Sequence, residues 1–182
     1  MESTADRYRR LAARFADTVA DVPADAWENT TPCEDWTTRD LVRHVVDSQN
    51  LFLGLVGRPP VKAPSVDDDP VAAWATTSGV IQADLEDPVA SSTEFDGFFG
   101  RTAFSDAVDR FLCMDLVVHR WDLARAAGLD TTIPADDVAM VMERAALMGD
   151  ALRSPGAFGD AVEPPPGADA QADMLAFLGR AA

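Results

Sequence analysis

The sequence contains two histidines, His44 and His119, and each falls where a helical pattern calls for an apolar side chain. At about 100° per residue, the apolar stripe of a helix expected over residues 102–127 continues through Asp115, His119 and Asp122. Asp115 and His119 are four residues apart, so both side chains can reach one point in space. Two imidazoles and one carboxylate are typical of catalytic zinc sites, which keep one position open for water or substrate. The pattern therefore predicts a divalent metal site at His44, Asp115 and His119.

The same pattern also has a purely structural interpretation. An inward histidine on a helix is commonly a core residue with satisfied hydrogen bonds, and Asp115 can pair with His119 instead of a metal. Asp122 is then either a partner that orients a histidine or a carboxylate near a helix end. Cys33, in the loop before His44, either approaches the site or only fixes a turn. The sequence leaves open whether Asp122 or Cys33 takes part.

Helical periodicity predicts the elements that must position these side chains. The expected helices, in which apolar residues recur at spacings of three and four, cover residues 3–22, 37–56, 70–86, 102–127, 135–151 and 170–179. Thr37 or Thr38 is expected to cap the second helix, and Asp96-Gly97 is expected to form a turn after a short extended piece. The pattern predicts an all-α fold, a four-helix bundle with one or two additional short helices, in one domain over residues 1–182.

The composition excludes several classes of partner. Thirty-one acidic and fifteen basic residues among 182 give a net charge of −16, whereas nucleic acids and anionic membranes attract positively charged surfaces. The longest apolar run is shorter than the ~20 residues of a membrane span, and the first residues are too polar for a signal peptide. Two cysteines do not suggest a disulfide framework. We therefore expect a cytoplasmic protein with neither nucleic acid nor membrane as its partner.

Two stretches of the chain resemble a bacterial family. Residues 31–44, TPCEDWTTRDLVRH, and residues 114–125, MDLVVHRWDLAR, are similar to the signature stretches of the DinB-like metal-binding superfamily, in the branch of the N-terminal domain of mycothiol-dependent maleylpyruvate isomerase. The resemblance covers most of the chain in the order of its helices. It implies a single DinB-like four-helix bundle and a divalent metal ion, zinc or nickel. The matching ligand positions are His44, Asp115 and His119, although the isomerase has a glutamate where this chain has Asp115.

The resemblance also implies a class of reaction. Characterised members of the family are often thiol-dependent transferases or isomerases, so it implies a metal-dependent enzyme of the thiol S-transferase or isomerase type. The metal would activate a low-molecular-weight thiol, such as mycothiol, or water, and the partners would be this thiol and a small electrophile. The alternative is a non-catalytic metal- or ligand-binding helical module. The substrate, the thiol, the metal and the assembly, monomer or homodimer, are not determined by the sequence.

Overall fold

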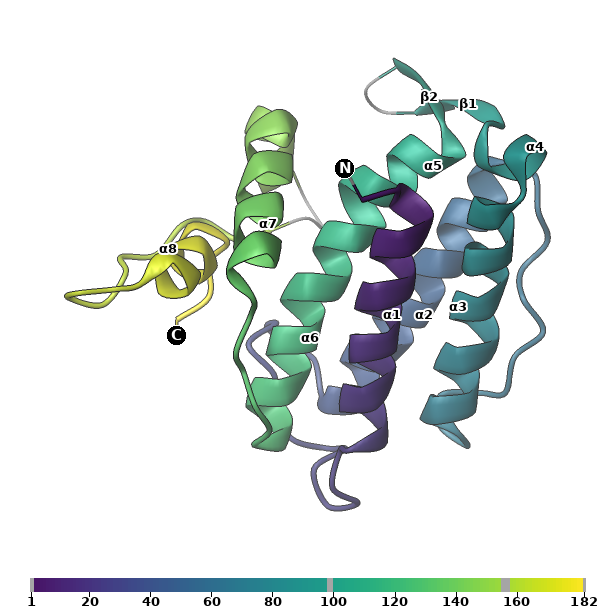
Figure 1. Cartoon of the computed structure of the whole chain (residues 1–182). Coiled ribbons are helices and arrows are strands. Elements are labelled where there is room, and N and C mark those ends of the chain that lie inside the picture. The colour runs from purple at the N-terminus through teal and green to yellow at the C-terminus, as the bar shows by residue number, and fades with distance from the viewer. Residues whose placement is uncertain (1, 98–99, 155–157, 182) are drawn as a thin grey trace. The chain divides into compact units, whose positions relative to one another are not determined.

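The computed structural model describes residues 2–97, 100–154 and 158–181, which are predominantly helical (Figure 1). The all-α fold that the periodicity predicts is confirmed. The chain divides into two compact units, residues 1–130 and 131–182, and each is described here by itself. The expectation of one domain over residues 1–182 stays a prediction. Among the described residues, no helix combines the length and the apolar character that crossing a membrane requires.

Four helices of the first unit form a bundle. They are α1 (Thr4–Ala20), α2 (Thr38–Leu55), α3 (Pro70–Glu86) and α6 (Cys113–Ala127). α1 packs against α3 and α6, and α2 packs against the same two helices. The order around the bundle is therefore α1, α3, α2, α6, which places the two histidine-bearing helices α2 and α6 side by side (Figure 1).

The first three helices begin at side chains that cap their free amide groups. The Ser3 hydroxyl accepts a hydrogen bond from the backbone of α1. Thr37, one of the two expected caps of α2, forms a reciprocal capping box with Asp40. The Asp69 carboxylate caps α3, and Pro70 occupies its first position, where a missing N–H group is tolerated. The expected starts of these helices agree with the structure to within a residue.

Large buried side chains fill the bundle, and their polar atoms are paired. Tyr8 is fully buried, and its hydroxyl donates to Oε1 of the buried Gln49 at 2.7 Å. The indole N–H of Trp74 donates to the Ala12 carbonyl at 3.2 Å, and the Trp74 ring packs edge-on against Phe15. A core of this kind stabilises the helices without a metal ion or a disulfide.

The exposed edge of α2 differs from the expected helical stripe. The sequence pattern groups His44 with Leu51 and Leu55 on an apolar inward face, but these leucines are 63% and 42% exposed. The buried face of α2 instead runs through residues such as Leu41, Val45 and Gln49. His44 lies at the border of that face and is half-buried. Within the bundle, α2 packs most extensively against α3 and α6.

A short β-hairpin follows α3 and the single-turn helix α4 (Pro88–Ser91). The extended piece expected over residues 91–95 overlaps β1 (Glu94–Gly97) only in part, because Ser91 ends α4. β1 pairs antiparallel with β2 (Gly100–Ala103). The expected Asp96-Gly97 turn is wrong, because both residues lie in β1 and pair across to β2. Residues 98–99, which connect the strands, lie outside the described residues.

The helix expected over residues 102–127 is shorter and is not uniform. It begins as α5 (Phe104–Ala107), because residues 102 and 103 belong to β2, and continues through a π-helical turn (Val108–Leu112) into α6. Gly128 ends α6 in the left-handed conformation, with φ 69°, which glycine adopts readily because it has no Cβ. A π-helical turn holds one residue more than an α-turn, so a helical wheel at constant pitch misplaces the residues before it relative to those after it.

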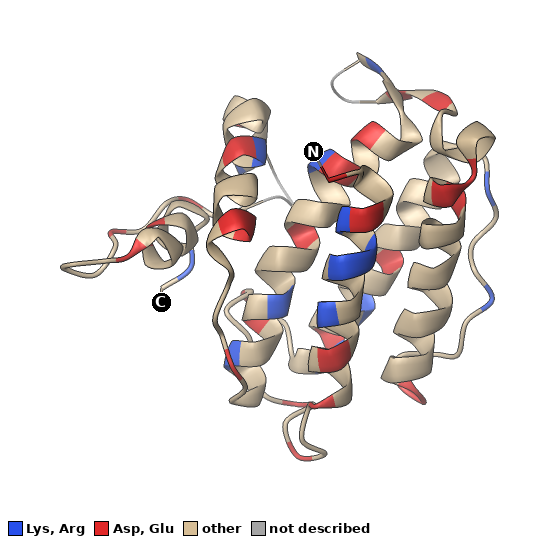
Figure 2. Cartoon of the chain, viewed as in Figure 1, with Lys and Arg blue, Asp and Glu red and all other residues tan. Residues whose placement is uncertain are grey.

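The second unit contains α7 (Ala135–Met148), a 3-10 turn (Gly149–Arg153) and α8 (Ala170–Phe177). The helices expected over residues 135–151 and 170–179 are therefore present, each slightly shorter than predicted. The Gln171 side chain connects the start of α8 to the segment before α7, since it accepts from the Ile133 N–H at 2.7 Å. Figure 2 shows acidic residues spread over helices and connecting loops, in keeping with the net charge of −16.

Candidate metal centre

His119 in α6 lies between two carboxylates of its own helix. Its Nε2 atom is 3.2 Å from Oδ1 of Asp115, one turn before it, and its Nδ1 atom is 3.0 Å from Oδ2 of Asp122, one turn after it. The His119 side chain is 7% exposed and that of Asp122 is completely buried. Asp115, His119 and Asp122 therefore lie on one face of the helix, as their spacing in the sequence predicts. Both ring nitrogens of His119 have a carboxylate partner.

His44 joins this cluster from α2. Its ring lies edge-on to that of His119, with 5.1 Å between the ring centroids. A nitrogen of each ring and a carboxylate oxygen of Asp115 all lie within 4.8 Å of one another. Two ligand atoms on one zinc ion at the tetrahedral angle are about 3.4 Å apart, so the 3.2 Å between His119 and Asp115 suits a shared metal. The structure thus brings together the three residues that the sequence predicts as ligands.

Asp122 lies behind His119, on the side away from Asp115. Histidines that bind metals commonly donate their other ring N–H to a carboxylate, which fixes the ring and its tautomer. A proton on Nδ1 of His119 satisfies Asp122 and leaves the Nε2 lone pair toward Asp115 and His44. Of the two roles that the sequence left open for Asp122, the geometry fits that of an orienting partner.

Cys33 reaches the same cluster from the loop before α2. Its Sγ atom is 3.4 Å from Oδ2 of Asp122 and 3.9 Å from Nδ1 of His119. Cys33, His119 and Asp122 therefore form a second group of donor atoms that could hold a metal ion. The two groups share His119, and a neutral imidazole has one free lone pair, so only one of them can be filled at a time. Thr31 also fixes the turn at Cys33 through hydrogen bonds with its backbone.

The Trp36 ring lies close to the rings of both histidines. Its ring centroid is 4.6 Å from that of His44 and 6.1 Å from that of His119. The loop that carries Trp36 is closed by a hydrogen bond from the Thr31 N–H to the Trp36 carbonyl, at 3.0 Å. Helical spacing could not reveal these contacts, because they depend on the path of an irregular loop. The only feature of the sequence that indicates a position for Trp36 near His44 is its place directly before Thr37, which caps the helix that carries His44.

The environment of the two imidazoles shifts their pKa values in opposite directions. Burial lowers the pKa of His44 below its ordinary value, although the negative charge of Asp115 acts against this. Burial also opposes the charged form of His119, but the charge of Asp115 and hydrogen bonds with Asp115, Asp122 and Cys33 outweigh it and raise the pKa of His119 well above its ordinary value. The cluster therefore favours a positive charge at His119, beside the two carboxylates.

Exposure falls across the cluster in one direction. His44 and Asp115 are half-buried, whereas His119 and Asp122 are buried. A metal ion held by His44, Asp115 and His119 would have its protein ligands on the side toward the bundle core. Its opposite side would face the partly exposed edge of α2 and α6. This is the arrangement that catalytic metal sites require for an exchangeable position.

The chain is similar to a known protein family and to two mycobacterial proteins. The family described as the mycothiol maleylpyruvate isomerase N-terminal domain matches residues 8–124, which include every residue of the cluster. The chain is 34% identical, over 176 residues and 95% of each chain, to the uncharacterized protein Rv0738 of Mycobacterium tuberculosis strain H37Rv. The same values hold for the uncharacterized protein MT0763 of strain CDC 1551. No solved structure matches the chain.

Proposed function

The chain belongs to the mycothiol maleylpyruvate isomerase N-terminal domain family, and from this premise we propose that it is a metal-dependent enzyme acting with a low-molecular-weight thiol. Its ligands are His44, Asp115 and His119. The observation that carries the proposal is the meeting of these three donor groups from two helices within 4.8 Å, with Asp122 on the second nitrogen of His119. Two imidazoles and a carboxylate fit a divalent ion such as zinc or nickel.

The residues of the cluster have separate roles in this proposal. Asp122 holds the His119 ring so that Nε2 faces the ligand position. Asp115 supplies the negative charge that offsets the charge of the cation, and Trp36 covers the His44 ring from the loop side. A bound divalent metal lowers the pKa of a coordinated thiol, so that the nucleophilic thiolate is present at neutral pH. The reaction is the transfer of the thiol sulfur to a small electrophile, or a thiol-assisted isomerisation, and mycothiol is the thiol that the family description suggests.

The His44 group suits this function better than the Cys33 group. A thiol substrate needs an exchangeable position, which the half-buried His44 and Asp115 leave open. In the Cys33 group, the completely buried Asp122 would become a ligand and would no longer orient His119. We therefore assign Cys33 to the surroundings of the site and not to the ligand set.

Thiol consumption tests the proposal. Purified protein loaded with zinc or nickel is mixed with mycothiol and a panel of small electrophiles, and free thiol is followed with and without a chelator. We expect thiol consumption above the uncatalysed rate, its loss with chelator, its return on adding metal, and no restoration in Asp115→Asn. A protein that binds one metal ion but never accelerates thiol consumption would favour the non-catalytic module.

A further inference from the structure

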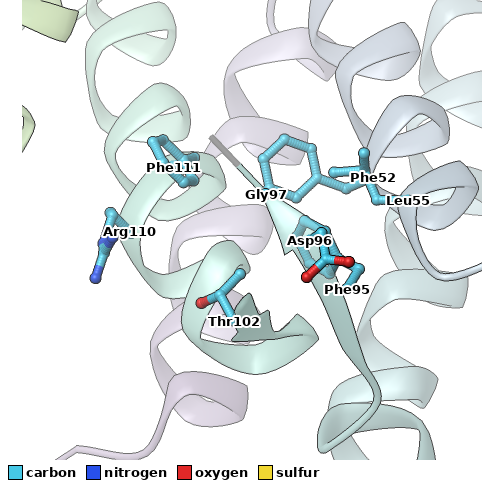
Figure 3. Close-up of a pocket in the computed structure, with 8 residues that line it drawn as sticks. All are labelled: Phe52, Leu55, Phe95, Asp96, Gly97, Thr102, Arg110 and Phe111. Carbon is cyan, nitrogen blue, oxygen red and sulfur yellow. The ribbon is translucent and has the colours of Figure 1, made fainter. Parts of the chain in front are cut away.

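A pocket of about 320 Å³ lies in the first unit between the end of α2, the β-hairpin and the π-helical turn (Figure 3). Four large apolar side chains line it: Phe52, Leu55, Phe95 and Phe111. The rings of Phe52 and Phe111 approach each other across α2 and the π-helical turn, with 6.1 Å between their centroids. None of these four belongs to the metal cluster, so the pocket is a feature separate from the ligand set.

The pocket lies farther along α2 than the metal cluster. Along α2, Phe52 follows Ser48 and His44 at successive spacings of four, and Ser48 Oγ is 3.5 Å from Nε2 of His44. On the facing segment, Phe111 precedes Asp115 by four residues. At 1.5 Å per residue along α2, Phe52 lies about 12 Å from His44 along the helix axis. A molecule that occupies the pocket and extends along α2 would approach the metal site.

The walls of the pocket select an uncharged and largely apolar ligand. The charged lining residues are Asp96 and Arg110, one of each sign. The Arg110 guanidinium is 6.0 Å from the centre of the Phe111 ring, and Figure 3 shows it on the side of that ring away from Phe52. An apolar protein cavity of about 150 Å³ holds one benzene molecule, so this pocket has room for about two ring-sized groups.

The thiol is a poor occupant of this pocket. Cellular low-molecular-weight thiols carry amide, hydroxyl or charged groups, and burying these without hydrogen bonds is unfavourable. The Phe52, Leu55, Phe95 and Phe111 side chains offer none, and Asp96, Thr102 and Arg110 are the polar side chains of the lining. The electrophile is the other substrate of the proposed reaction, and its body need not be polar.

We propose that this pocket is the electrophile subsite, and that the enzyme acts on uncharged aromatic or aliphatic electrophiles of one to two ring sizes. The inference rests on the proposed function and names its substrate class. With an aryl chloride, the thiolate sulfur forms a bond to the ring carbon, the electron pair of the breaking carbon–chlorine bond leaves with chloride, and the thiol proton passes to solvent. The chain needs no further oxidant or reductant for this step.

Leu55 and Leu51 provide a matched pair for the test. Both lie on α2 and are exposed enough to tolerate a larger side chain, but Leu55 lines the pocket and Leu51 does not. Binding of naphthol, an uncharged two-ring probe, is measured by calorimetry on metal-free protein. We expect Leu55→Trp to weaken binding at least about tenfold because its ring fills the pocket, and Leu51→Trp to change it less than about twofold. Maleate, a small dianion, should not displace naphthol.

A second measurement separates this inference from the proposed function. With metal-loaded protein, mycothiol and chlorodinitrobenzene, Leu55→Trp should raise KM for the electrophile at least about tenfold and leave KM for the thiol unchanged. Absence of naphthol binding, equal binding by wild type and Leu55→Trp, or displacement by maleate would overturn the subsite. If naphthol binds as expected but no electrophile gives chelator-sensitive turnover, the proposed function fails while the apolar site stands. If turnover is chelator-sensitive but only charged electrophiles react, the substrate class is wrong while the function stands.

Discussion

The Oδ2 atom of Asp122 lies 3.0 Å from Nδ1 of His119, so a completely buried carboxylate holds the ring whose other nitrogen faces Asp115 and His44. This contact involves neither of the other two proposed ligands. It divides the cluster into an inner part that orients and an outer part that binds. The first prediction concerns the inner part.

Replacing Asp122 with asparagine should weaken metal binding without removing the ligands. Loss of the carboxylate beside a metal-binding histidine typically lowers metal affinity about 10- to 100-fold, because the ring loses its orientation and some of its basicity. The affinity is measured by competition with a chromophoric chelator. Arg125→Gln, an exposed change on the same helix, serves as the control and should leave the affinity unaltered. Equal affinities for Asp122→Asn and wild type would remove Asp122 from the site.

Metal content should distinguish the two donor groups around His119. We expect about one equivalent of metal in wild type and in Cys33→Ala, and almost none in His44→Ala or Asp115→Ala, because a ligand is lost in the last two. Elemental analysis of the purified variants measures this. The reverse result, with metal lost in Cys33→Ala and kept in His44→Ala, would assign the ion to Cys33, His119 and Asp122. Asp17→Asn, an exposed acidic position on α1, is the control for a simple change in net charge.

Metal binding should release a proton near neutral pH. The pKa of His119 is raised well above its ordinary value in the metal-free protein. The ring is therefore protonated at neutral pH, and the incoming metal displaces that proton. His44 has a lowered pKa and is already neutral. The metal Kd should therefore fall about tenfold per pH unit as pH rises, and this dependence should end above the pKa of His119. Calorimetry in buffers of different ionisation enthalpy counts the proton, and a count of zero at neutral pH would contradict the prediction.

Removing the metal should lower stability without unfolding the protein. An ion that binds only the folded state adds RT ln(1 + [M]/Kd), which is about 4 kcal/mol at a thousandfold excess over Kd. The bundle core, with Tyr8, Phe15 and Trp74 completely or almost completely buried, folds without it. Circular dichroism should show a helical protein with a lower Tm after chelation. Loss of the helical signal at room temperature would instead mean that the metal is structural.

Much of the bundle and of the candidate site was predictable from local patterns. Spacings of three and four predicted the helices, and the four-residue interval predicted that Asp115 and His119 share a face. The contacts of Cys33 and Trp36 were not predictable in this way, since they depend on how the loop before Thr37 folds back over α6. The start of the 104–127 helical segment was misplaced because residues just before it pair in the hairpin, and pairing between strands is not a local property.

The position of Leu51 illustrates a related limit. A helical wheel identifies an apolar stripe but not which part of the stripe faces another helix, and Leu51 is 63% exposed. The π-helical turn (Val108–Leu112) adds to this uncertainty, because it changes the rotation between Phe104 and Asp115. Neither feature changes the relative positions of Asp115 and His119, since both residues lie after the π-helical turn.

The side-by-side placement of α2 and α6 also affects how the chain folds. His44 and Asp115 are 71 positions apart (115 − 44), and closing a flexible loop of that length lowers the entropy of an unfolded chain by an amount that corresponds to about 4 kcal/mol. An unfolded chain therefore rarely brings the three donors together. In the folded bundle they are already together, so metal binding does not carry this entropic cost. The rate at which a bound ion is lost would then report how often α2 separates from α6, and a coloured metal would serve as a local probe of breathing in the bundle.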